Sequence, residues 1–121
     1  MNPCPCGLKA DYDDCCGRWH AGAPAASAEA LMRSRYSAYV RGLEDYLLAT
    51  WHADTRPERV EIEAGLKWLG LEVRRVLEVG EHATVEFVAR SKLAGRAMRL
   101  HETSRFVREH GRWFYVDGEL R

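Results

Sequence analysis

The order of hydrophobic and polar residues divides the chain into a helical first part and a second part with the period of β-strands. Hydrophobic residues recur at helical spacing from Met32 to Leu43, and Ser27 and Gly42 stand where an N-cap and a helix end are expected. The pattern then predicts a short second helix beginning near Glu44 and a third helix over residues 57–66.

After residue 67 hydrophobic residues alternate with polar ones, as in strands with one buried face. Turn-forming sequences separate four such strands at residues 80–82, 93–95 and 110–111. On the first strand, one face is expected to carry Leu69, Leu71, Val73, Leu77 and Val79. Helices followed by an antiparallel meander predict an α+β fold.

Composition and charge narrow the class of protein. The chain has 121 residues, of which 46% are hydrophobic and 30% charged, enough for one domain with its own core. Eighteen basic and eighteen acidic residues give zero net charge, which makes nucleic acid an unlikely partner. The sequence shows no signal peptide and no apolar run long enough to span a membrane, so we expect a cytoplasmic protein.

All four cysteines stand near the start of the chain, at Cys4, Cys6, Cys15 and Cys16. Thiols stay reduced in the cytoplasm, where clustered cysteines indicate a metal site before disulfides. Four thiolates complete a tetrahedral zinc site and leave no open position for substrate. The sequence therefore predicts a structural Zn²⁺.

Two alternatives to this ligand set remain open. The cysteines could form disulfides, although the pairing of Cys4 with Cys6 and of Cys15 with Cys16 joins residues too close in the chain for relaxed geometry. His20 and His52 are spare candidate ligands, but four cysteines already suffice.

Several sequence strings resemble a known family. The run from Cys4-Pro5-Cys6-Gly7 to Cys15-Cys16-Gly17 resembles the SEC-C zinc motif, named for the C-terminus of the SecA translocation ATPase. Leu31-Met32-Arg33-Ser34-Arg35-Tyr36 and Leu100-His101-Glu102-Thr103-Ser104-Arg105-Phe106 resemble the YchJ family of uncharacterised bacterial proteins, over essentially the whole chain.

The resemblance implies an N-terminal SEC-C zinc hook over residues 1–20 and a YchJ-type domain over residues 27–121. That domain is expected to be similar to nuclear transport factor 2 (NTF2-like), a cone of about three helices packed on a curved four-stranded antiparallel sheet. Two features differ from the family pattern: Cys16 stands where the SecA motif has histidine, and the second SEC-C motif of longer relatives does not appear up to Arg121.

An acidic residue interrupts the hydrophobic face of the third strand. Glu102 and Ser104 lie in a row that is otherwise hydrophobic, whereas alternation places His101 and Arg105 on the opposite face. A carboxylate facing a core needs a partner or a cavity. We expect an ion pair with Arg33 or Arg35 of the first long helix.

Two functions fit these features. The first is an interaction or adaptor module that docks a protein partner through the hook, ranked first because no nucleophile–base pair or phosphate-binding motif is present. The second is a small enzyme or ligand-binding protein that uses the cone, with Glu102 as general base and His52 or Tyr115 as acid. A filled core favours the adaptor; a deep cavity in which Glu102 has no arginine partner favours the second function.

Overall fold

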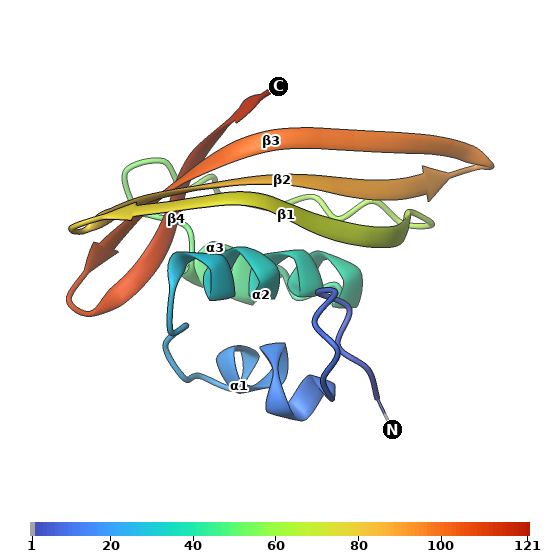
Figure 1. Ribbon diagram of the computed structural model, residues 1–121. Coiled ribbons are helices and arrows are strands. Elements are labelled where there is room, and N and C mark those ends of the chain that lie inside the picture. Colours follow the sequence, from blue (N-terminus) through green and yellow to red (C-terminus); the bar gives the residue numbers. More distant parts are fainter. Residues whose placement is uncertain (1) are drawn as a thin grey trace.

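A four-stranded antiparallel sheet with a long helix across one face forms the body of the protein (Figure 1). The computed structural model describes residues 2–121, and the strands lie side by side in chain order. The elements are η1 (Tyr12–Asp14), α1 (Cys16–His20), α2 (Ala28–Arg41), α3 (Glu44–Ala49), β1 (Lys67–Val79), β2 (His82–Leu93), β3 (Arg96–Glu109) and β4 (Arg112–Leu120). Three helices with a curved open sheet confirm the expected α+β class.

Helix α2 begins and ends at the residues that the sequence indicated. The Ser27 hydroxyl accepts a hydrogen bond from the Ala30 N–H at 3.0 Å, and Gly42 ends the helix in the left-handed conformation with φ of 74°. One side of α2 packs on the sheet to form the main core. Its buried members are Ala28, Leu31, Met32, Tyr36, Ala83, Val85, Phe87, Ala89, Phe106 and Trp113.

The expected helix over residues 57–66 does not form, so that prediction was wrong. Hydrophobic Val60 and Ile62 alternate with glutamates, a spacing that favours extended chain over helix. The Val60 N–H donates to the Glu44 carboxylate at 2.9 Å, and the Val60 side chain is buried against Ala38 and Leu47. The segment is therefore fixed by contacts with α2 and α3, and the third helix is α1, near the N-terminus.

The three predicted turns connect the four strands. At residues 94–95 and 110–111 both residues have positive φ, with 50° at Ala94 and 53° at His110. This is the backbone of the two-residue turn whose twist matches that of the strands it joins. The tight turns hold the strands in a meander.

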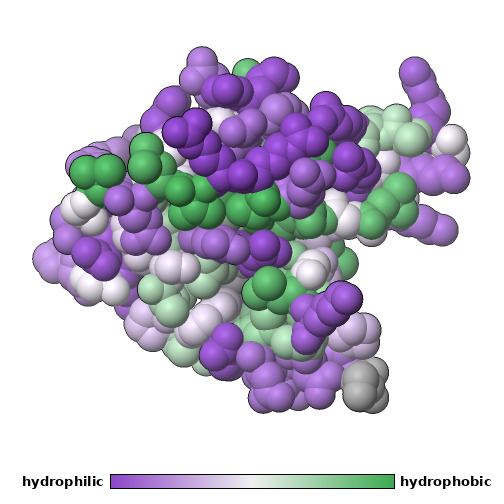
Figure 2. Space-filling view, viewed as in Figure 1, coloured by the Kyte–Doolittle hydropathy of each residue, from purple (hydrophilic) through white to green (hydrophobic). Residues whose placement is uncertain are grey.

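Strand β1 departs from simple alternation because its register shifts at two bulges, between Trp68 and Gly70 and between Val73 and Arg75. A one-residue bulge moves the following side chains to the other face. Leu77 therefore lies opposite Thr84 and is 52% exposed, so the single row predicted on this strand was wrong. Figure 2 shows the resulting band of hydrophobic residues along the sheet.

The N-terminal segment packs on the side of α2 that faces away from the sheet (Figure 1). A His20 Nε2 atom lies 2.8 Å from the Ser34 carbonyl oxygen, and Arg33 Nη1 donates to the Cys6 carbonyl at 2.8 Å. Residues 18–20, at the end of the expected hook, are part of α1. Helix α2 thus lies between the cysteine segment and the sheet. No helix within residues 2–121 is long and apolar enough to cross a membrane.

Candidate metal centre and cavity

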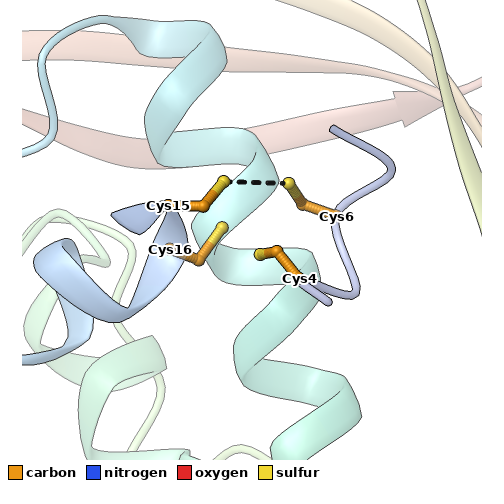
Figure 3. Close-up of side chains that lie close together, drawn as sticks. All are labelled: Cys4, Cys6, Cys15 and Cys16. Atoms are coloured by element: carbon orange, nitrogen blue, oxygen red, sulfur yellow. Dashed lines mark hydrogen bonds between the residues drawn. The ribbon is translucent and has the colours of Figure 1, made fainter. Parts of the chain in front are cut away.

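The four cysteines converge at the N-terminal end of the molecule (Figure 3). Cys4 and Cys6 come from the first loop, Cys15 directly precedes α1, and Cys16 begins that helix. A hydrogen bond from the Cys4 N–H to the Ala10 carbonyl at 2.9 Å closes the loop between the two pairs. All four sulfur atoms are buried and lie within 4.8 Å of one another.

The sulfur positions fit a tetrahedral metal better than they fit disulfides. Four Zn–S bonds of about 2.3 Å place neighbouring sulfurs about 3.8 Å apart, whereas a disulfide needs about 2.05 Å. The Cys6 and Cys15 sulfurs lie 3.6 Å apart, and all four cysteines are free thiols. The site can therefore hold one metal ion with no open coordination position.

Neither spare histidine joins this cluster. His20 bonds through Nδ1 to the Tyr12 hydroxyl and through Nε2 to the Ser34 carbonyl, so both ring nitrogens have partners away from the sulfurs. His52 lies at another part of the surface, with Nε2 2.9 Å from the Glu109 carboxylate. Among residues 2–121 the metal-ligating group consists of cysteines alone.

Hydrogen bonds among the thiols favour one thiolate in the cluster. A hydrogen bond with Cys16 lowers the pKa of Cys6 to about 5, although burial opposes the shift. Burial raises the pKa of Cys15 to about 11, and the hydrogen bond to Cys6 raises the pKa of Cys16. Further negative charge is costly in this buried group unless a cation neutralises it.

A cavity of about 300 Å³ lies between α2 and the concave face of the sheet. Aromatic and aliphatic side chains form most of its wall, and Arg35, Glu102 and Ser104 contribute polar groups. The remaining lining residues are Met32, Tyr36, Tyr39, Trp51, Trp68, Phe87, Ala89, Leu100, Phe106 and Tyr115. The cone is therefore not a filled core.

Glu102 lies in this cavity without the expected arginine partner. Its carboxylate accepts a hydrogen bond from Ser104 at 2.7 Å, and within residues 2–121 it forms no ion pair with Arg33 or Arg35. The side chain lies directly over Gly118 of β4, where an added Cβ would overlap the carboxylate. The predicted ion pair was wrong because both arginines are held elsewhere.

Arg33 and Arg35 point to opposite sides of α2. Arg33 pairs with Glu29 at 2.9 Å on the side of the cysteine segment. Arg35 is 6% exposed, and its Nη1 donates to the Leu47 carbonyl and to the Thr50 hydroxyl, each at 2.7 Å. Burial lowers the pKa of Arg35 to about 10, and the Glu102 carboxylate is among the groups that oppose the shift.

The structure brings together two of the three weak catalytic candidates. Glu102 and Tyr115 both line the cavity, and burial raises the pKa of Tyr115 to about 12. His52 is not among the lining residues, and its ring packs edge-on against Phe114. On the other face of the sheet His101 lies 2.7 Å from Glu86, as strand alternation predicted.

Sequence reasoning missed the place of Arg35 in the cavity wall. Its guanidinium stacks on two aromatic rings, 5.1 Å from the centre of Trp51 and 4.6 Å from that of Tyr115. A signal was present, because Arg35 lies at helical spacing between Met32 and Tyr39 on the hydrophobic side of α2. A charged residue on such a stripe indicates a polar cavity or a buried ion pair.

A four-cysteine hook joined to a curved sheet around a helix defines a SEC-C motif protein with an NTF2-like domain. Residues 27–118 match the family described as YchJ, middle NTF2-like domain. The chain belongs to the YchJ family.

Relatives and solved structures agree with this assignment. A UPF0225 protein of Bordetella pertussis is 60% identical over 98% of this chain and 92% of its own length. A UPF0225 protein of Methylibium petroleiphilum is 65% identical over 98% of this chain and 88% of its own length. The solution structure of a SEC-C motif-containing protein from Rhodopseudomonas palustris has a TM-score of 0.86, with 38% identity and 98% of both chains covered. A crystal structure of a SEC-C motif-containing protein from Psychrobacter arcticus has a TM-score of 0.82 at 29% identity, covering 100% of this chain and 84% of that one.

Proposed function

We propose that this protein binds a small organic ligand in the cavity between α2 and the sheet, and that a Zn²⁺ ion holds the cysteine segment in place. The observation that carries the proposal is the cavity of about 300 Å³ in which Glu102 has no arginine partner among residues 2–121. A volume of this size is at the lower end of the range for small-molecule sites. A cavity in which Glu102 has no arginine partner among the described residues is the condition given above for a ligand-binding protein or small enzyme rather than an adaptor.

The donor set supports zinc as the metal. Four thiolates are soft ligands, and closed sites of this kind hold structural zinc. Besides the cysteines, the segment buries only parts of Ala10, Tyr12 and Trp19 in its own cluster, too little apolar surface to fold alone. Metal binding then supplies the free energy that orders residues 2–20 on α2.

Blocking the entrance to the cavity tests the ligand proposal. Leu100 lines the cavity and is 36% exposed, so Leu100→Trp fills the entrance with little change in the core. The matched control is Val79→Trp, because Val79 is 67% exposed and outside the cavity. We expect small aromatic fragments, detected by saturation-transfer NMR, to bind the wild type and the control but not Leu100→Trp. Equal binding to all three proteins, or to none, contradicts the proposal.

A further inference from the structure

The cavity contains two opposite charges that form no direct ion pair within residues 2–121. Arg35 and Glu102 both line it, yet they form no ion pair within the part of the chain that the structure describes. Each charge has part of its hydrogen-bonding capacity unused. A ligand that fits this cavity must therefore match two charged groups.

Arg35 is held in place before any ligand arrives. One nitrogen, Nη1, is fixed by Leu47 and Thr50, and the guanidinium carbon lies over the rings of Trp51 and Tyr115. Within residues 2–121, Nε and Nη2 donate to no protein acceptor, so a guanidinium edge remains for an anionic group.

Glu102 is fixed in a comparable way. Ser104 donates to Oε2, and the absence of a side chain at Gly118 leaves the space that the carboxylate occupies. Across residues 2–121 the second oxygen, Oε1, accepts no hydrogen bond from protein. It is available to a donor or a cationic group in the cavity.

Ligands with a single charge fit this arrangement poorly. An anion bound to Arg35 would share a small, low-dielectric space with the Glu102 carboxylate, and a cation bound to Glu102 would share it with Arg35. A zwitterion satisfies both groups, and the aromatic walls formed by Tyr36, Trp68 and Phe87 suit an apolar body.

We infer that the cavity binds a small zwitterion with an aromatic or apolar body, its anionic group on Arg35 and its cationic group on Glu102. This inference rests on the proposed function, which requires only that the cavity takes a ligand. Four probes with one phenyl body separate the contributions: L-phenylalanine as the zwitterion, 2-phenylethylamine as the cation, 3-phenylpropanoate as the anion and 2-phenylethanol as the neutral probe.

NMR titrations that follow the indole N–H signals of Trp51 and Trp68 measure the affinity of each probe. We expect L-phenylalanine to bind at least about tenfold more tightly than either singly charged probe, the effect of one additional charge-assisted hydrogen bond. Glu102→Gln should weaken the zwitterion and the amine but not 3-phenylpropanoate. The matched control Glu86→Gln, on the opposite face of the sheet, should change none of them.

The possible outcomes separate the inference from the proposed function. If L-phenylalanine binds no more tightly than the singly charged probes, or if Glu102→Gln weakens all four probes equally, the zwitterion inference is wrong and the cavity remains a ligand site. If none of the four probes shifts either indole signal, the proposed function fails as well. Arg35→Lys gives a second measurement, which should weaken L-phenylalanine and 3-phenylpropanoate more than the amine.

Discussion

Replacement of Gly118 by alanine tests how closely Glu102 is packed against β4. An added Cβ would overlap the Glu102 carboxylate, so this side chain must move, and we expect it to lose the hydrogen bond from Ser104. The backbone of Gly118 does not have a positive φ, and alanine is therefore not strained there by its conformation. The expected cost comes from the side-chain contact alone.

The size of the effect follows from the contact that is lost. A hydrogen bond to a charged group contributes about 1.5–3 kcal/mol to stability. Because Glu102 is partly exposed, we expect Gly118→Ala to lower the free energy of unfolding by about 1–2 kcal/mol. For a domain of 121 residues this lowers Tm by roughly 4–8 °C.

A double-mutant cycle with Glu102→Ala isolates this contact, measured by thermal and urea unfolding. With the carboxylate removed, Gly118→Ala should cost less than about 0.5 kcal/mol, so the coupling energy should be about 1 kcal/mol or more. If Gly118→Ala lowers the free energy of unfolding equally with and without the Glu102 side chain, the glycine is needed for the conformation of the backbone. Our account of how Glu102 is held would then be wrong.

Four further predictions concern the cysteine segment. Protein purified without added metal should contain about one zinc per chain by elemental analysis, and Cys16→Ser should reduce the zinc content. Zinc-free protein with four reactive thiols would contradict the proposed metal site. Burial lowers the pKa of His20 in the folded protein. The neutral His20 ring therefore contributes to stability above its unfolded pKa of about 6.5, and this contribution is lost as pH falls through the lower pKa of the folded state. The Tm difference between wild type and His20→Asn should therefore narrow towards pH 5, measured at pH values where zinc content is unchanged; a constant difference would contradict this. Deletion of residues 1–20 should leave a chain that unfolds in one cooperative transition, because within residues 2–121 the main core contains no residue before Ala25. The protein partner expected for the hook should be captured from an extract of the native cells without chelator and lost with it, and an equal yield under both conditions would contradict docking through the metal site.

The sequence predicts those parts of the fold that depend on local chemistry. Ser27 and Gly42 set the limits of α2, and the turn residues at 94–95 and 110–111 separate the strands, since caps and turns act within a few residues. The cysteine cluster was also predictable, because four ligands of one kind in a short segment have few other uses.

Features that depend on contacts distant in sequence could not be predicted in the same way. Residues 57–66 are fixed by Glu44 and by burial of Val60, and no local pattern reports either contact. The expected partner of Glu102 was chosen by helix position, but Arg35 is held by Leu47 and Thr50. Strand bulges likewise depend on pairing between β1 and β2, which hydrophobic alternation does not encode.

The position of α2 between the cysteine segment and the sheet has a thermodynamic consequence. One side of this helix contacts the cysteine cluster, where the Ser37 hydroxyl oxygen lies 3.7 Å from the Cys4 sulfur. The other side supplies Arg35 and Tyr39 to the cavity wall. If metal binding and ligand binding both favour one arrangement of this helix, the two events are linked, and linkage is reciprocal. Whatever factor the proposed zinc ion adds to the affinity of the cavity for its proposed ligand, the ligand adds the same factor to the affinity for zinc. On this proposal, the supply of metal in the cell sets how much of the protein is ready to bind a ligand.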